Sequence, residues 1–265
     1  MPVEISDLHG LWHRSLLVRP DGTRDTSTWV AWLQGPSFYA DLRLPAGRPS
    51  FHGVCCRNDI TASQLTWLAR QEGFAGRLER DGAFFVWRRA LDFQPEALAA
   101  DAGALRLEGG IMIEEGRDIA YVEHWHPQTE PTPPLCAVRL RDRETGRGGF
   151  MVRAGTSFMY ARAGAAASLP PGLSLGACVE SAGSLARAQE LVDCEISLGR
   201  VGPEGWLIAR STLPYREGAR LDPETRRQSP DRCRTGDVTP DGAPASRDWE
   251  IMELEGDAAA ASTVA

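Results

Sequence analysis

The sequence predicts a mainly β protein of antiparallel sheets, organised as two similar units. Short runs rich in Trp, Val, Leu and Thr alternate with turns rich in Gly, Pro and Asp, which is typical of strands that follow one another in a meander. Segments also recur in the same order in both halves of the chain, and such a repeat indicates one folding pattern used twice. The recurring segments are Trp12-His13 with Trp125-His126, Val18-Arg19 with Val138-Arg139, Gly35-Pro36-Ser37-Phe38 with Gly155-Thr156-Ser157-Phe158, Leu68-Ala69-Arg70 with Leu185-Ala186-Arg187, and Ile111-Met112 with Ile251-Met252.

The first unit, residues 1–117, is predicted to contain strands and one short helix. Thr61 can cap a helix over 61–72, in which Leu65, Leu68 and Ala69 recur at helical spacing. An Asp-Gly pair at 81–82 is a hairpin-turn signal between two apolar runs. The expected strands cover 8–18, 28–33, 38–44, 74–79, 83–91, 104–107 and 111–114.

The second unit, residues 118–256, is expected to repeat this plan, with its helix over 184–192. Residues 222–247 are rich in Pro, Arg, Asp and Gly, and we expect them to form a solvated, mobile loop, with a lid over a pocket as the alternative. Residues 257–265 are expected to be a disordered tail. The expected strands cover 120–126, 135–141, 149–154, 157–162, 195–198, 205–213 and 249–255.

Meanders of this kind curl to hide their edges, so each unit is expected to close as a small barrel, or both to share one larger barrel. Gly10-Leu11-Trp12 resembles the Gly-x-Trp motif that opens lipocalins and other calycins. Trp125 takes the corresponding place in the second unit, with Glu123 where the glycine would be. The resemblance implies a barrel with an internal cavity for a small apolar or amphipathic ligand, and it implies no particular catalyst.

Composition excludes several classes of function. The net charge of −7 and the pI near 5.3 argue against nucleic acid and anionic membranes as partners. The chain contains no lysine, which excludes Schiff-base chemistry. It also lacks a phosphate-binding glycine loop and a nucleophile elbow, and no cofactor is expected. The N-terminal residues do not resemble a signal peptide, so a cytoplasmic location is expected.

One motif resembles a metal site. His124 and His126 alternate along a strand and share a face, and Glu130 follows, as in the metal-binding spacing of cupins. However, Trp125-His126 has an apparent counterpart in Trp12-His13, and the later cupin histidine is missing. We therefore interpret the motif as part of the scaffold and predict no metal, with an ion site as the alternative.

The polar side chains of the strand over 38–44 are the sharper candidates. Tyr39, Asp41 and Arg43 share one face, and the apolar residues between them share the other. If the apolar face packs outward, the polar face lines a cavity; otherwise it is a solvated surface. At an offset of 120 residues the second unit has Met159, Ala161 and Ala163, so the module does not require the polar set. Ligand binding is assigned to Trp29, Trp32, Gln34, Tyr39 and Arg43.

These observations favour a protein that binds a small hydrophobic or aromatic molecule in its first unit. One alternative is a cofactor-free acid/base enzyme, such as a hydratase, isomerase or decarboxylase, that uses Asp41, Arg43 and Tyr39. The other is a protein-interaction module that recruits a partner through exposed sheet edges. A homodimer is compatible with all three.

Overall fold

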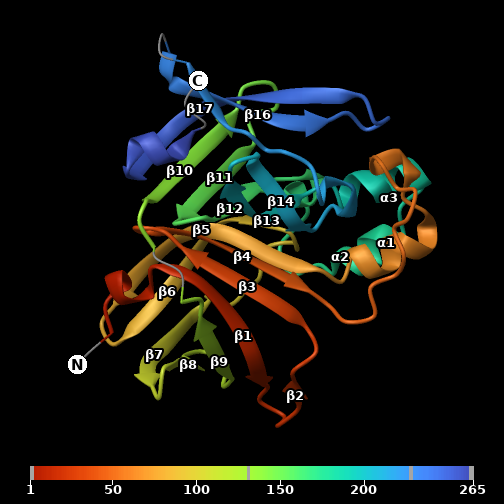
Figure 1. Ribbon diagram of the computed structural model, residues 1–265. Coiled ribbons are helices and arrows are strands. Elements are labelled where there is room, and N and C mark those ends of the chain that lie inside the picture. The colour runs from red at the N-terminus through yellow and green to blue at the C-terminus, as the bar shows by residue number, and fades with distance from the viewer. Residues whose placement is uncertain (1–2, 130–131, 227–228, 263–265) are drawn as a thin grey trace.

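The computed structural model describes residues 3–129, 132–226 and 229–262 and confirms the predicted mainly β, antiparallel class (Figure 1). Eight strands of the first half form a closed barrel. They are β1 (Gly10–Val18), β3 (Trp29–Gln34), β4 (Phe38–Leu44), β5 (Glu72–Asp81), β6 (Phe84–Asp92), β7 (Ala102–Glu108), β8 (Ile111–Gly116) and β9 (Val122–Pro127). Each pairs with the next, and β9 pairs with β1 to close the ring, while the short β2 (Arg24–Asp25) extends the end of β1.

The second sheet is open, so the expectation of a second closed barrel is wrong. Its strands are β10 (Leu135–Asp142), β11 (Gly148–Ala154), β12 (Ser157–Arg162), β13 (Glu195–Gly202), β14 (Gly205–Ser211), β15 (Glu224–Arg226), β16 (Ser229–Val238) and β17 (Pro244–Gly256). Their order is β14-β13-β12-β11-β10-β17-β16-β15. An irregular segment lies between β14 and β16: Leu221 donates to the carbonyl of Trp206, and Gly236 donates to the carbonyl of Leu221.

The two sheets share one strand order. If the barrel is opened between β6 and β7, it reads β6-β5-β4-β3-β1-β9-β8-β7, which matches the second sheet strand for strand. This seam is short in the barrel, with only Phe85 and Val86 in register with β7. Trp87 and Trp206 lie on matching strands, and so do Trp125 and Trp249.

The main hydrophobic core lies between the sheets, outside the barrel. Phe38, Ala40 and Leu42 of β4 pack in one cluster with residues of the second sheet such as Phe150, whose ring lies edge-on to Phe38 at 5.4 Å. Tyr39 and the other alternate residues of β4 face the barrel interior. The apolar face thus packs outward, which is the arrangement in which the polar residues face an enclosed space.

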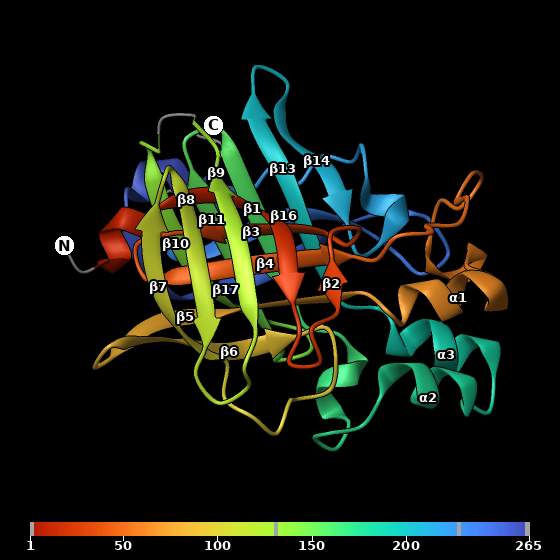
Figure 2. The ribbon, with the colours of Figure 1, turned by 90° about the horizontal axis from the view of Figure 1, so that it is seen from below.

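Three short helices lie side by side at one flank of the two sheets (Figures 1 and 2). Thr61 and Ser184 precede two of them, as predicted, and the Ser184 hydroxyl accepts a hydrogen bond from the backbone nitrogen of Arg187. The helices are α1 (Ala62–Leu68), α2 (Leu175–Glu180), which was not predicted, and α3 (Leu185–Leu191). Within the described residues, no helix has the length and apolar character needed to cross a membrane.

Two segments that were expected to be a mobile loop and a disordered tail are ordered. Residues 222–247 belong largely to β15, β16 and β17, where cross-strand ion pairs such as Arg234–Asp248 stabilise a polar hairpin. Residues 258–261 form a 3₁₀ turn, and Ala260 and Ala261 pack against the second sheet, so this part of the tail is ordered. Residues 263–265 lie outside the described residues.

The strand over 120–126 was assigned to the wrong unit. As β9 it lies between β8 and β1 in the barrel, with His126 in register with His13. Trp12-His13 and Trp125-His126 are therefore neighbours in one barrel, where both tryptophans face the interior. The two Trp-His pairs resemble each other because both tryptophans face the barrel interior. Their similarity is therefore not evidence for the repeat.

Candidate functional site

The barrel encloses a cavity of about 340 Å³. Its mouth lies among the turn after β1, the connection from β6 to β7 and the turn before β9, which contribute Arg19, Ala100 and Ile119. At the other end a 3₁₀ turn, Ile5–Leu8, caps the barrel, because the indole nitrogen of Trp12 donates a 2.7 Å hydrogen bond to the carbonyl of Leu8. The cavity is of a size that suits a small molecule, since ligand pockets begin at about 300 Å³.

Tryptophans form much of the cavity wall. The ring of Trp32 lies 5.9 Å from Trp87 and 5.8 Å from Trp125, both edge-on. The indole nitrogens of Trp32 and Trp125 are buried and have no hydrogen-bond partner within the described residues. A buried donor without a partner costs about 1–3 kcal/mol, so an acceptor on a ligand would be favoured at either nitrogen.

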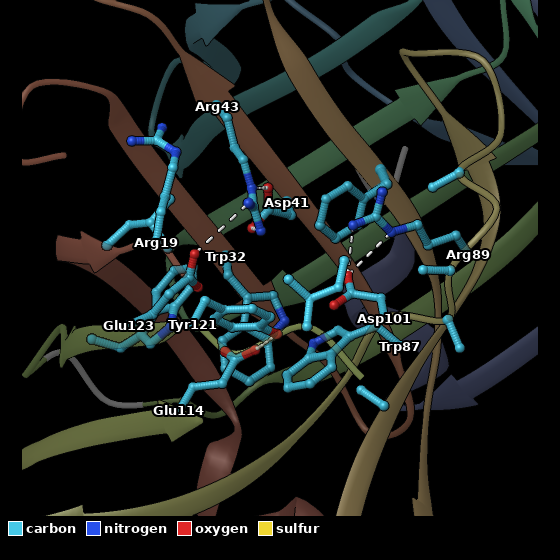
Figure 3. Close-up of a pocket in the computed structure, with 18 of the residues that line it drawn as sticks. Arg19, Trp32, Asp41, Arg43, Trp87, Arg89, Asp101, Glu114, Tyr121 and Glu123 are labelled. Atoms are coloured by element: carbon cyan, nitrogen blue, oxygen red, sulfur yellow. Dashed lines mark hydrogen bonds and ion pairs between the residues drawn. The ribbon is translucent and has the colours of Figure 1, made fainter. Parts of the chain in front are cut away.

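Asp41 and Arg43 hold each other at the wall formed by β4 (Figure 3). Nε of Arg43 donates a 2.7 Å hydrogen bond to Oδ1 of Asp41, and another guanidinium nitrogen lies 3.9 Å from Oε1 of Glu123. Burial raises the pKa of Asp41, and the adjacent guanidinium only partly offsets this effect. The pair presents a polar but internally neutralised surface to the cavity.

A second arginine is anchored near the seam of the barrel. Arg89 of β6 donates a 2.6 Å hydrogen bond to Asp101 and a 2.9 Å hydrogen bond to Asp92, and its guanidinium lies 3.5 Å from the centre of the Phe74 ring. Burial would lower the pKa of Arg89, but the two carboxylates raise it above its ordinary value. Arg89 therefore stays charged and already paired.

Glu114 of β8 is bound differently. Its Oε1 accepts a 2.6 Å hydrogen bond from the hydroxyl of Tyr121, and no arginine lies within ion-pair distance of it among the described residues. Burial, reinforced by the charges of Glu123 and Asp101, raises the pKa of Glu114 well above its ordinary value. Glu123, by contrast, is held by a guanidinium nitrogen of Arg14 at 2.5 Å.

Small residues make room for this carboxyl group. A Cβ at Gly116 would lie 2.4 Å from the ring of Tyr121, so the glycine allows the ring to pack against β8 and to aim its hydroxyl at Glu114. A Cβ at Gly103 would lie 3.0 Å from Cγ of Glu114. The missing side chain at Gly103 thus lets the side chain of Glu114 pack closely against β7.

The residues singled out from the sequence divide into two groups. Asp41, Arg43 and Trp32 line the cavity. Tyr39 is fully buried beside Phe74, and its hydroxyl has no hydrogen-bond partner in the described part of the chain. Gln34 is buried at the turn after β3, where it donates to the carbonyl of Gly35, and Trp29 packs outside the cavity beside His13. The proposed ligand set is therefore not brought together as one surface.

The apparent difference between the two units also needs correction. Asp41 is in register with Trp32, and in the second sheet Tyr160 is in register with Met151. The structural counterparts on β12 are one residue earlier than the sequence offset indicated, because Met159 and Ala161 pack in the core between the sheets, and a shift of one residue exchanges the two faces of a strand. Tyr39, Asp41 and Arg43 match Phe158, Tyr160 and Arg162, and not Met159, Ala161 and Ala163.

Five polar cavity residues were not identified from the sequence. Three of them lie on or near β8 and β9, and alternation along those strands carries a usable signal, since Met112 and Glu114 share the inward face. Trp87 also lines the cavity. The missed polar residues are Arg89, Asp101, Glu114, Tyr121 and Glu123.

The histidine motif lies on the outside of the barrel. Nε2 of His126 is 2.8 Å from the hydroxyl of Ser15, and His124 lies on the same outward face of β9. Glu130 lies outside the described residues. Within the described ranges, no three His, Cys, Asp or Glu side chains are grouped so that they could hold a metal ion.

Comparisons with known proteins identify a fold and no function. No family model and no curated protein matches the chain. An uncharacterized protein of Saccharomyces cerevisiae is similar in structure, with a TM-score of 0.52 and 11% identity over 93% of this chain and 98% of that one. The DNA polymerase III β subunit of Thermotoga maritima aligns over 94% of this chain and 77% of that one, with 9% identity and a TM-score of 0.13, which is too low to support any argument. The chain thus shares its overall fold with the yeast protein.

Proposed function

We propose that this protein binds a small, largely aromatic or apolar molecule inside the barrel, as a calycin-like carrier or sensor. The observation that carries the proposal is the cavity itself: a space of about 340 Å³ walled by tryptophans, with a few fixed polar groups. Apolar walls supply affinity, and the small number of polar groups fixes the orientation of a ligand. The two buried indole nitrogens without partners support the same reading.

Retention of a small molecule tests this proposal. Native mass spectrometry of freshly purified protein is expected to show a bound species, and an Ala100→Trp variant, which fills the mouth, is expected to lose it. Ala209→Trp is the matched control, because Ala209 is also exposed but lies on β14, away from the cavity. Equal retention in both variants would place the molecule elsewhere.

A protein without a retained molecule can be tested with a hydrophobic fluorophore that competes for the cavity. Its binding is expected to quench tryptophan emission, since Trp32, Trp87 and Trp125 line the space. The proposal would be contradicted if the wild type retained no molecule and the fluorophore also caused no quenching that Ala100→Trp reduces.

The second candidate is a cofactor-free acid/base enzyme in the same cavity. The observation that favours it is Glu114, a buried carboxyl group with a raised pKa beside the Tyr121 hydroxyl, as catalytic acids often are. A proton-transfer catalyst would exchange carbon-bound hydrogen of the retained molecule in D₂O. Exchange in the wild type and its loss in Glu114→Gln would support catalysis; a retained molecule that takes up no deuterium would exclude it.

A further inference from the structure

The charged groups of the cavity are unevenly matched. Arg43 pairs with Asp41, and Arg89 pairs with Asp101. Glu123 pairs with Arg14, which reaches it from β1. Once these three pairs are made, Glu114 is the carboxyl group of the cavity wall that has no guanidinium partner among the described residues.

Glu114 is well placed to meet a ligand. It is only 4% exposed, and it lines the cavity. Its single side-chain hydrogen-bond partner in the described chain is Tyr121, which leaves its other carboxyl oxygen free to accept. A buried carboxylate needs a cation or a set of donors, and the described residues supply only the Tyr121 hydroxyl.

The aromatic surroundings suit a cation as well. Trp32, Trp87, Trp125 and Tyr121 line the same cavity as Glu114. The faces of such rings attract ammonium groups by about 0.5–2 kcal/mol, most strongly when both are removed from water. An anionic ligand would find its natural partners, Arg43 and Arg89, already occupied by carboxylates.

The unpartnered indole nitrogens add a second requirement. Trp32 and Trp125 are 1% and 2% exposed, and each offers a buried N–H group with no acceptor in the described chain. An ammonium group cannot accept these hydrogen bonds. A ligand that satisfies both features carries an oxygen or nitrogen acceptor in addition to its positive charge.

We infer that the cavity ligand is a small protonated amine with an aromatic or apolar body and a hydrogen-bond acceptor, and that Glu114 is the residue that recognises its charge. This inference rests on the proposed binding function and specifies its ligand class. No covalent bond of the ligand is made or broken. On binding, Glu114 gives up its proton to solvent and forms a charge-assisted hydrogen bond with the ammonium group.

The test uses three molecules that share a phenol ring and differ in charge: tyramine, tyrosol and para-hydroxyphenylacetate. Isothermal titration calorimetry with the full chain is expected to give tyramine at least a tenfold tighter Kd than tyrosol, as expected for one charge-assisted hydrogen bond. The anionic molecule is expected to bind most weakly. Quenching of tryptophan emission gives an independent readout.

Variants separate recognition of charge from folding. Glu114→Gln is expected to remove the preference for tyramine and to leave the Kd of tyrosol within about threefold of wild type. Glu115→Gln is the matched control, since Glu115 is the next residue of β8 but lies on the exposed face, paired with Arg106. Tyrosol binding shows directly that each variant is folded.

A pH series adds a reading specific to Glu114. The groups that act on it are Tyr121, Glu123, Asp101 and Arg43. Because the carboxyl group must lose its proton to hold the amine, affinity for tyramine is expected to rise as pH increases through the raised pKa of Glu114, while affinity for tyrosol stays level.

The results that overturn the inference are distinct from those that overturn the function. Tyramine binding no tighter than tyrosol, a preference that survives Glu114→Gln, or a retained molecule without an amine would each refute the amine while a cavity ligand remains. Absence of both a retained molecule and cavity-dependent quenching would refute the proposed function instead.

Discussion

The barrel and the second sheet have the same strand order and use it in opposite ways. In the second sheet, buried polar groups are paired with one another: Arg162 and Arg216 both donate to Glu195, and the indole nitrogen of Trp249 donates to Thr235. In the barrel, the matching strands leave Glu114 without a cation and the nitrogen of Trp125 without an acceptor within the described residues. The difference teaches that one strand order can hold a fully paired set of buried polar groups or leave some of them unpaired beside a cavity.

The arginines on β4 and β12 show this most directly. Arg43 is in register with Glu72, and Arg162 is in register with Glu195. Arg162 is 7% exposed and bound closely to Glu195 and Asp193, whereas Arg43 is 4.0 Å from Glu72, whose side chain is largely exposed. In the second sheet the arginine and the glutamate belong to a closed network of ion pairs. In the barrel the corresponding arginine, Arg43, lines the cavity.

The largest expected effect comes from opening the closed network. Glu195→Gln removes the carboxylate that two buried guanidinium groups share and leaves Arg216 without an ion-pair partner among the described residues, so it is expected to lower the free energy of unfolding by about 3–5 kcal/mol. Asp41→Asn is expected to cost about 1–2 kcal/mol, because Arg43 keeps Glu123 and Glu72 nearby. Urea unfolding measures both, and a larger loss for Asp41→Asn would reverse the comparison.

An intermediate effect is expected from pH. Folding raises the pKa of Glu114, so its contribution to stability is present at low pH and is lost as pH rises through the raised value. Asp193 is the opposite case: burial works against it, but Arg162 and Arg57 lower its pKa, so its contribution is lost as pH falls below about 3.9.

One titrating group changes the free energy of unfolding by at most about 1.4 kcal/mol per pH unit. Glu114→Gln is therefore expected to flatten the decline of stability with rising pH, and Asp193→Asn the decline with falling pH. Urea midpoints across the pH range measure both slopes. Unchanged slopes in both variants would refute the assignment.

The smallest expected effect compares matching tryptophans. Trp249→Phe removes a buried 3.0 Å hydrogen bond to Thr235, while Trp125→Phe removes an N–H group that has no partner in the described chain. We expect Trp249→Phe to cost about 1 kcal/mol more in free energy of unfolding than Trp125→Phe. Equal costs would mean that the Trp125 nitrogen has a hydrogen-bond partner. Addition of the cavity ligand should then leave the difference in free energy of unfolding between the two variants unchanged.

Much of the fold could be predicted from local signals. The alternation in β4 correctly separated Phe38, Ala40 and Leu42 from Tyr39, Asp41 and Arg43, because strand geometry fixes which side chains share a face. The capping residue Thr61 located α1 for the same local reason, and α3 was located by its similarity to that segment in the first unit. Closure of the first barrel and opening of the second sheet depend on contacts between distant segments, which a single sequence does not display.

The candidate site was harder to predict than the fold. Asp41 and Arg43 were found because they are adjacent in one strand, whereas Glu114, Tyr121 and Glu123 meet them only after β9 closes the ring. The apparent repeat of Trp12-His13 moved β9, together with Tyr121 and Glu123, into the wrong unit. The charged hairpin β16–β17 was missed because cross-strand ion pairs replace the apolar alternation that normally marks strands.

Packing of the β4 outer face on the second sheet also bears on how this protein could be redesigned. The chain keeps its largest apolar cluster outside the barrel, so the residues that line the cavity are not members of that cluster. Cavity residues can then be exchanged to suit a new guest while the scaffold retains its main source of folding energy. The barrel interior is therefore a suitable place to introduce substitutions.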